Sequence, residues 1–384
     1  MKGQFEHAML PDVVHDEEAR MEFVTSFKVH VLTGLQPGNK KLYEAKVKPA
    51  LAKKSGGPKT MRDIAAGMKP EPYWQMFSSL NRTGQEMMWD TLGHRIGRQL
   101  DDLVERASDT AAKTKKRGTL RLNPALDVPR YNSEIHIHCQ PGGYHQELSD
   151  TTNDVFAGAL YDLGAFQYGM GGQGPLVDDV GDTLAKYLKK TWPDFKPKRI
   201  LDLGCGVGHQ TLALVDHFPG AEVHACDLGA PMVRYAHARA EALGKTVHFS
   251  QQNAEQTDFP DESFDLVVSA ILFHETSAKA VPNIINECHR LLKKGGVMAH
   301  GDVPEFNKFW PDPYDQFQRD WTTHFNAEPF RGKMRDMDMP ALAVKAGFKR
   351  GNVIETRLPS EYGSSLYAKT HAYGALWWTL AARK

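Results

Sequence analysis

The sequence lacks several features that would define a class of protein at once. No run approaches the roughly 18 apolar residues of a membrane-spanning helix, and residues 1–21 lack the charged-then-apolar pattern of a signal segment. Its few cysteines have no paired spacing, which favours reduced thiols over a disulfide framework. We therefore expect a cytoplasmic protein with no membrane partner. The cysteines are Cys139, Cys205, Cys226 and Cys288.

An excess of charge of either sign is also missing. The 47 Lys and Arg residues balance the 47 Asp and Glu residues, so the formal net charge is zero. A protein whose main partner was nucleic acid would usually be basic overall or on one face. The densest basic run, Lys113–Arg121, is typical of a solvated loop. We therefore expect no nucleic-acid partner.

The chain of 384 residues is too long for most single domains, and its character changes along its length. Residues 1 to about 125 show helical periodicity. The stretch from Pro37 to Pro72 is rich in Lys, Gly and Pro, which predicts long loops and short helices. We predict a mainly helical N-terminal domain over residues 1–175, with a cap or oligomerisation role, and a second domain over residues 176–384.

From Lys198 onward, short apolar runs alternate with helical segments. This alternation predicts an α/β fold with a doubly wound, mostly parallel sheet and helices on both faces. Ligands of such sheets bind beyond the carboxyl ends of the strands. The predicted strands are Arg199–Leu203, Glu222–Cys226, Val247–Gln251, Phe264–Ser269 and Val297–Gly301. The predicted helices are Val177–Lys190, Gln210–His217, Pro231–Leu243 and Val281–Leu292, the last ended by Gly295-Gly296.

The first of these strands leads directly into a glycine-rich turn, Gly204-Cys205-Gly206-Val207-Gly208. Glycines there allow a sharp turn and the close approach of a ligand. Asp227 follows at the end of the second strand, where a carboxylate can accept hydrogen bonds from both ribose hydroxyls. The turn and Asp227 fit any adenosine cofactor, including NAD.

Asp202 argues against a dinucleotide. It lies just before the glycines, where it would repel the pyrophosphate that a dinucleotide places on the following helix N-terminus. An acid suits instead the cationic amino and sulfonium groups of S-adenosylmethionine (SAM). The third strand ends in Asn253-Ala254-Glu255, which offers an amide to the edge of an adenine ring.

These motifs stand, with Phe264–Ala270 and Leu291–Gly296, in the order found in the class I SAM-dependent methyltransferases, which residues 198–302 resemble. The resemblance implies a Rossmann-like sheet of seven strands. Its last elements would be the helix Asp336–Gly347 and an antiparallel hairpin of Asn352–Thr356 and His371–Ala382. It also implies that SAM is the cofactor.

The same resemblance assigns cofactor contacts. The family often carries aspartate where Asn253 stands, and an amide can still bond adenine. The assignments are Asp202, Gly204, Cys205, Gly206 and Gly208 around the methionine end, Asp227 on the ribose, Leu228 and Met232 beside the adenine, Asn253, Ala254 and Glu255 at its edge, and Ala270 near the methionine portion.

On the acceptor side, a hydroxyl group usually needs a base, and histidine is the commonest choice. His274 follows the fourth strand, where many family members also carry histidine. It is our first catalytic candidate. The alternative is a structural histidine that packs beside the cofactor.

A second candidate group surrounds Glu134–His138, whose alternation predicts a strand. On a strand, His136 and His138 would face the same side, and with His145 across a turn they could bind Zn or Fe. No fourth ligand can be identified, so we assign no metal. The group could also form a polar wall of the substrate pocket through His138, Tyr144 or His145. We place His138 and His145 among the catalytic candidates, with plain structure as the alternative.

Two aromatic segments complete the acceptor side. In related enzymes a segment just before the core closes over the cofactor, so we expect Tyr161 or Tyr168 to touch SAM or substrate, or else to pack a domain interface. An insertion at about residues 304–335 lies where the family forms a substrate lid. Its aromatics could line an apolar pocket or form the subunit interface of a homodimer. They are Trp310, Tyr314, Phe317, Trp321, Phe325 and Phe330.

Together these features predict a SAM-dependent methyltransferase that acts on a small molecule, with a hydroxyl oxygen as the first choice of acceptor. Methylation of carbon, nitrogen or sulfur remains open. A macromolecule-directed methyltransferase would have the same core. A nicotinamide-dependent oxidoreductase would share the turn and Asp227, and a non-catalytic SAM-binding partner protein is a further alternative.

Overall fold

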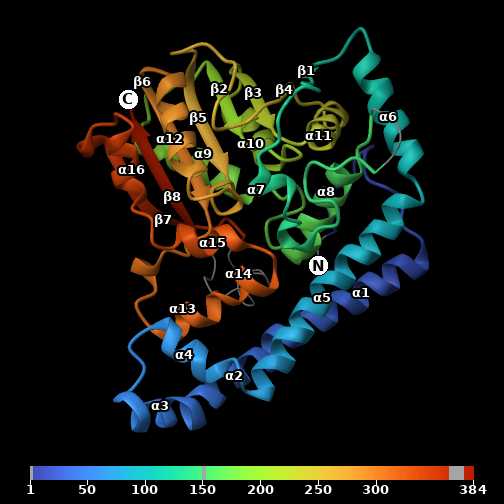
Figure 1. Ribbon diagram of the computed structural model, residues 1–384. Helices are drawn as coiled ribbons and strands as arrows, with labels where there is room; N and C mark the ends of the chain where they lie inside the picture. The colour runs from blue at the N-terminus through green and yellow to red at the C-terminus, as the bar shows by residue number, and fades with distance from the viewer. Residues whose placement is uncertain (1–2, 149–152, 363–375) are drawn as a thin grey trace.

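A single sheet forms the centre of the molecule in the computed structural model, which describes residues 3–148, 153–362 and 376–384 (Figure 1). The strand order is β1-β4-β3-β2-β5-β6-β8-β7. Strands β1 to β6 pair in parallel, and β8 runs antiparallel to both β6 and β7. The strands are β1 Thr119–Arg121, β2 Arg199–Leu203, β3 Glu222–Asp227, β4 His248–Gln251, β5 Phe264–Ala270, β6 Leu292–Asp302, β7 Val353–Pro359 and β8 Leu376–Arg383.

The doubly wound, mostly parallel sheet is as predicted, but the count of seven strands is wrong. The described residues form eight, because β1 pairs with the edge strand β4. Gly118 permits this pairing, since a Cβ there would lie 2.0 Å from the carbonyl oxygen of Val247. The basic run Lys113–Arg121 therefore ends in a strand, which is too short for its alternation to be recognised.

Helices cover both faces of the sheet, as strands buried on both sides require. Leu201 and Leu203 of β2 pack in one hydrophobic cluster with α12, whereas Ile200 packs with α10 and α11 in another. The helices from the core onward are α9 Asp179–Thr191, α10 His209–His217, α11 Ala230–Ala242, α12 Ala280–Leu291, α13 Pro313–Arg319, α14 Trp321–Phe325, α15 Pro329–Met334 and α16 Met339–Lys345.

Two predicted boundaries near the end of the chain differ from the structure. Helix α12 ends at Leu291 and β6 begins at the next residue, so Gly295-Gly296 lies inside the strand and does not end the helix. The predicted strand His371–Ala382 overlaps β8, and its residues 371–375 lie outside the described residues.

Long helices precede the core. The long loops predicted between Pro37 and Pro72 are wrong. Residues 15–55 are helical without a break, and each proline follows a π-helical turn, Pro37 after Val31–Leu35 and Pro49 after Tyr43–Val47. The helices are α1 His15–His30, α2 Gln36–Leu42, α3 Lys48–Ser55, α4 Met61–Met68, α5 Pro72–Gly97, α6 Leu100–Ala112, α7 Arg130–Ser133 and α8 Phe156–Tyr168, with π-helical turns at Val31–Leu35 and Tyr43–Val47.

The predicted strand Glu134–His138 is also wrong. Helix α7 ends at Ser133, and a single 3-10 turn, Ile137–Cys139, follows. His138 adopts a left-handed backbone conformation with φ of 56°. His136 and His138 therefore do not share the face of a strand.

The insertion packs against the N-terminal helices. Figure 1 shows α13 and α14 between the sheet and helices α2 and α4. Tyr314, Phe317 and Trp321 are buried there in one hydrophobic cluster with Trp74 and Phe77 of α5. These three insertion aromatics are enclosed within one chain, so they cannot form the subunit interface considered above.

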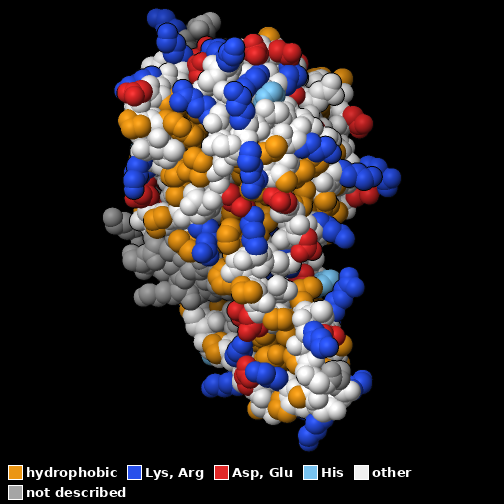
Figure 2. Space-filling model, turned by 90° about the vertical axis from the view of Figure 1, so that its left-hand side faces the viewer, with side chains coloured by type: hydrophobic (Ala, Val, Ile, Leu, Met, Phe, Trp, Pro, Cys, Tyr) orange, Lys and Arg blue, Asp and Glu red, His pale blue; other side chains and the backbone are white. Residues whose placement is uncertain are grey.

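The surface carries charge of both signs. Figure 2 shows Lys and Arg side chains interspersed with Asp and Glu on the face in view, which agrees with the zero net charge. Across the described ranges, no helix has the length and apolar character needed to cross a membrane.

Candidate active site

A first cavity lies at the carboxyl ends of β2 and β5, where the strand order reverses. From β2 the chain continues through β3 and β4 on one side of the sheet and through β5 and β6 on the other. Doubly wound sheets bind ligands at this point. The empty space of the cavity, including the part open to solvent, is about 700 Å³. Eight predicted cofactor contacts line it: Gly204, Gly206, Asp227, Leu228, Met232, Asn253, Ala254 and Ala270.

The glycine turn forms the floor of this cavity. Gly204, Gly206 and Gly208 have φ of 66°, 55° and 79°, a region that side chains other than glycine rarely adopt. A Cβ on Gly204 would lie 2.5 Å from Leu272 across the cavity. Glycine therefore keeps open the space that a ligand needs.

Asp227 sits at the end of β3, against this turn. Its two carboxylate oxygens accept hydrogen bonds from the backbone N–H groups of Gly206 (2.9 Å) and Gly229 (3.0 Å). Burial raises the pKa of Asp227, and these N–H groups oppose the rise. A carboxylate has about four lone-pair positions, so it can still accept bonds from a ligand in the cavity.

Asp202 lies behind the turn and not on the cavity wall. One of its oxygens accepts a hydrogen bond from the Thr211 hydroxyl at 2.6 Å, and the other has no partner among the described residues. Burial, opposed by the Thr211 bond, raises the pKa of Asp202 to about 7. The acid therefore sits in a fully buried place beneath the turn, where it disfavours an anionic ligand such as a pyrophosphate.

Four other predicted contacts are not on the wall of the first cavity. Cys205 is buried within the turn, and Gly208 begins α10. Glu255 accepts hydrogen bonds from the Tyr131 hydroxyl (3.0 Å) and from Asn283 (2.8 Å), so it holds the lining residue Tyr131 in place. Tyr168 lines a neighbouring cavity, while Tyr161 lines the first.

A second cavity adjoins the first, and the two share a wall. The shared side chains are Tyr144, Tyr161, Ile271 and Glu275. Segments far apart in the sequence supply the rest of the second cavity, including Trp89, His138, Tyr168, His274, Arg331 and Trp377. Its walls therefore combine aromatic side chains with a group of ionisable side chains.

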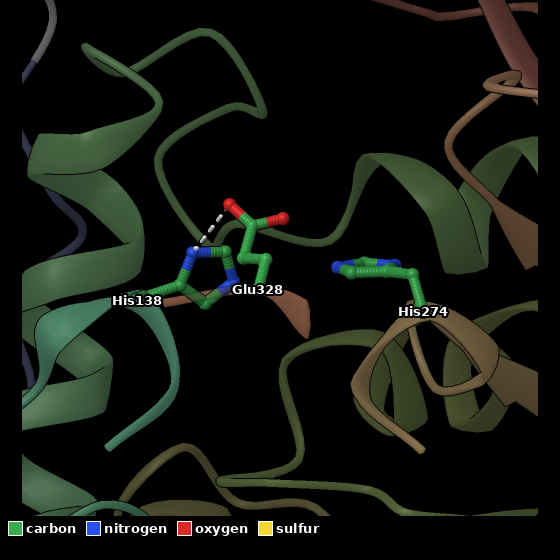
Figure 3. A group of neighbouring side chains, drawn as sticks. All are labelled: His138, His274 and Glu328. Carbon is green, nitrogen blue, oxygen red and sulfur yellow. Dashed lines mark ion pairs between the residues drawn. The ribbon is translucent and has the colours of Figure 1, made fainter. Parts of the chain in front are cut away.

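That ionisable group brings together His138, His274 and Glu328 (Figure 3). Glu275 lies between the two imidazoles: one of its oxygens is 2.8 Å from His138 Nε2 and 3.1 Å from His274 Nε2. Glu328 is 3.2 Å from His138 Nδ1. Asp302 at the end of β6, which the sequence analysis missed, is 2.5 Å from His274 Nδ1.

Each histidine is therefore held between two carboxylates. Burial opposes their charged forms, but Glu275 and Glu328 raise the pKa of His138 to about 9. Asp302 and Glu275 likewise outweigh burial and raise the pKa of His274 to about 10. Both imidazoles are then protonated at neutral pH, and a protonated His274 cannot serve as the resting general base.

Glu275 itself has an oxygen that nothing satisfies. Burial would raise its pKa, but the two imidazolium groups lower it well below its usual range, so the carboxylate is ionised. Its second oxygen, Oε2, is buried and has no hydrogen-bond partner among the described residues. Because Glu275 lines both cavities, a ligand there would supply that partner.

A metal could be held only at the cost of this charge pairing. Within the described ranges, the one group with suitable spacing is His138, His274 and Glu328, whose ligand atoms lie within 4.8 Å of one another. Metal-bound histidine must be neutral, so a metal ion would compete with protons for both imidazoles. His145 is half-buried with its pKa lowered by burial and by His136, and neither belongs to this group.

Comparisons with known proteins find similarity in the region that forms most of the first cavity. Residues 200–296 match the family described as "Methyltransferase domain". A demethylmenaquinone methyltransferase of Thermus thermophilus is 35% identical over 137 residues, which are 35% of this chain and 59% of the relative. A malonyl-[acyl-carrier protein] O-methyltransferase of Methylococcus capsulatus is 32% identical over 161 residues, which are 41% of this chain and 55% of the relative.

A third relative matches over more of its length. A ubiquinone/menaquinone biosynthesis C-methyltransferase of Psychromonas ingrahamii is 27% identical over 204 residues, which are 50% of this chain and 74% of the relative. The chain spans somewhat more than half the length of the first two relatives. Residues 200–296 are therefore similar to a methyltransferase domain, in agreement with the resemblance to the class I SAM-dependent methyltransferases.

Proposed function

We propose that this chain transfers a methyl group from SAM in the first cavity to a small-molecule acceptor in the second. The observation that carries this proposal is the wall common to both cavities, formed by Tyr144, Tyr161, Ile271 and Glu275. Methyl transfer is an in-line displacement, so donor and acceptor must lie on either side of one point. When bound, SAM supplies the electrophilic methyl carbon.

The residues of the first cavity fit SAM. The carboxylate of Asp227 has lone pairs left for the ribose hydroxyls, and Asn253, which follows the neighbouring strand β4, also lines the cavity. Leu228 and Met232 offer apolar surface for the adenine. The buried acid Asp202 beneath the turn suits a cationic ligand better than a phosphate.

Glu275 is the ionised side chain that lines both cavities. In this proposal its unpartnered Oε2 accepts a hydrogen bond from the acceptor O–H. As the oxygen–methyl bond forms, the oxygen becomes positively charged and its proton passes to that carboxylate. His138 and His274 hold the other oxygen and keep Glu275 ionised beforehand. A hydroxyl acceptor is our first choice because it donates the hydrogen bond that Oε2 lacks.

Transfer to carbon is the second candidate. A relative is named a C-methyltransferase, and the charged side chain of His138 lines the second cavity, where it would stabilise an enolate or phenolate oxygen of the acceptor. In that case the nucleophile would be a carbon activated by its neighbouring oxyanion. The position of the new methyl group in the product separates the two candidates.

The test is formation of S-adenosylhomocysteine with size-matched acceptors that carry a phenolic hydroxyl, an activated ring carbon, an amine or a thiol. We expect turnover with the hydroxyl compound and a methoxy group in the product by mass spectrometry and NMR. A C-methyl product would select the second candidate. Failure of the protein to bind SAM by calorimetry would refute both.

The larger organisation is part of the same proposal. The N-terminal segment, residues 1–175, would act as a cap over the acceptor, since it supplies Trp89, His138 and Tyr168 to the second cavity. The homodimer and the cytoplasmic location stay predictions. Sedimentation analysis of the purified chain tests the first, and fractionation of its native cells tests the second.

A further inference from the structure

A third cavity continues from the second toward the N-terminal helices. It lies between α1 and α5 on one side and α13 to α15 on the other, and it meets the second cavity at Tyr168 and Arg331. Aromatic side chains such as Phe77 and Trp321 form much of its wall. The methyl-transfer site of the proposed function therefore opens into a longer space than a small planar acceptor would fill.

Lys28 of α1 is an unusual component of this cavity. Its side chain is 94% buried, since only 6% of the residue is exposed. Its ammonium donates to Gln85 Oε1 at 3.0 Å, contacts the sulfur of Met88 at 3.3 Å and lies 5.0 Å from the ring centre of Tyr168. Among the described residues, no carboxylate lies within ion-pair distance of it.

A buried ammonium without an opposite charge is costly, and proteins usually pair or neutralise it. Burial lowers the pKa of Lys28 to about 7, because the charged ammonium is less stable away from water and loses its proton more easily. An alkyl side chain would fill the same space without this cost. An anion that enters the cavity and pairs with the ammonium would offset the cost of burying a lysine here.

The wall of the third cavity carries three further charged side chains. Arg319 and Arg331 line the third cavity, against the single carboxylate of Glu305. That carboxylate is 3.5 Å from Arg331 and 3.1 Å from Arg335, so it is already paired. Arg331 is also paired with Glu328 at 2.7 Å, so Lys28 is the cation of this wall to which an anionic ligand would bind.

We propose that the third cavity binds an acidic end group, a carboxylate or a phosphate, of an elongated acceptor whose reactive end lies in the second cavity. The identification of the ligand as the methyl acceptor rests on the proposed function, whereas the anion site itself does not. Lys28 pairs with the acidic group, Gln85 orients the ammonium, and the aromatic walls contact the apolar body of the molecule. The acceptor is then an amphipathic acid with its methyl-accepting group away from the acid.

The experiment is calorimetry with three eight-carbon probes: octanoate, octyl phosphate and octan-1-ol. We expect at least one of the two anions to bind tenfold or more tightly than the alcohol. Lys28→Met should remove that preference, whereas Lys28→Arg should keep part of it. Lys53→Met, an exposed lysine of α3, is the matched control and should change nothing. The stronger anion shows whether the site suits a carboxylate or a phosphate.

A second measurement on the unmodified protein covers the case in which Lys28→Met does not fold. A lysine of lowered pKa reacts readily with acetic anhydride at neutral pH, and peptide mapping reports the extent at each lysine. The preferred anion should protect Lys28 fivefold or more and leave Lys53 unchanged. Equal binding of all three probes, or equal labelling of Lys28 with and without anion, would overturn the proposal.

These tests do not depend on methyl transfer. Anion binding that requires Lys28, in a protein that forms no S-adenosylhomocysteine, would keep the site and remove the proposed function. Turnover of neutral acceptors by a protein that shows no anion preference would do the reverse.

Discussion

The two sides of the active site are built differently. The first cavity is formed mainly by the segments that follow β2, β3, β4 and β5, from Gly204 to Thr276, and includes two glycines of the turn and the carboxylate of Asp227. The second cavity takes His138 from a turn, Tyr168 from α8, Arg331 from the insertion and Trp377 from the last strand. The cofactor side is thus local in sequence, whereas the acceptor side exists only after the whole chain has folded.

This difference predicts that changes on one side should leave the other side nearly intact. Substitutions at the acceptor wall should act on turnover, and substitutions at the end of β3 should act on SAM affinity. Glu275 lies on the wall common to both cavities, so a substitution there is the strictest test of whether effects on turnover and on SAM affinity are separate.

The largest expected effect is that of Glu275→Gln. The change removes the charged acceptor oxygen and leaves His138 and His274 without their common carboxylate. General acid–base groups contribute about 10²- to 10⁴-fold, so we expect kcat to fall at least a hundredfold while SAM affinity changes less than tenfold. Glu105→Gln, at an exposed position of α6, is the control and should keep most of the activity. A kcat within threefold of the unmodified protein would contradict the role of Glu275.

Asp227→Ala should come next in size. Hydrogen bonds to charged groups contribute about 1.5–3 kcal/mol each, and about 1.4 kcal/mol corresponds to tenfold in affinity. We expect calorimetry to show SAM binding weakened tenfold or more, with Asp227→Asn intermediate. Asp216→Ala removes a half-exposed carboxylate of the same domain and should leave the affinity unchanged. Unchanged affinity in Asp227→Ala would show that the cofactor is placed wrongly.

A smaller effect concerns pH and the acceptor side. The pKa of His138 rises from 6.5 to about 9 on folding, so its protonation stabilises the fold below pH 6.5, and this contribution is lost as the pH rises toward 9. We expect the stability difference between the unmodified protein and His138→Gln to shrink between pH 6.5 and pH 9.5. Urea unfolding at several pH values measures it.

Comparison with the variant is needed because Lys28, whose pKa is lowered, depends on pH in the opposite sense in both proteins. A difference that stays constant or grows with pH would mean that His138 is neutral in the folded state.

The smallest expected effect is that of metal removal. Since His138 and His274 are charged, the group they form with Glu328 should hold no stoichiometric metal at neutral pH. Elemental analysis should find no stoichiometric metal, and treatment with a chelator should leave turnover unchanged. One equivalent of zinc or iron that disappears in Glu328→Gln would establish a metal site and revise the acceptor side.

The contrast between the two sides also explains what the sequence could predict. The strands around the first cavity were located to within a residue or two, because strictly local rules place a glycine turn after a buried strand and an acid after the next. Tyr131 and Leu272 were missed there, since they reach the cavity from a short helix and a loop without a sequence signal.

On the acceptor side, the alternation of Glu134–His138 was interpreted as a strand. The segment instead forms a turn with His138 in a left-handed conformation. Periodicity alone cannot distinguish such a turn from a strand. His138 is brought to His274 by packing between segments 136 residues apart. The roles of Asp302 and Glu328 depend on the same tertiary contacts, so no local pattern could identify them.

The measurement that tests the account most directly is a crystal structure with S-adenosylhomocysteine. The account predicts the adenosine between Asp227 and Asn253, with the sulfur toward the wall of Tyr144, Tyr161, Ile271 and Glu275 and thus toward the second cavity. A sulfur that points away from this wall, or a ligand bound outside the first cavity, would contradict the account.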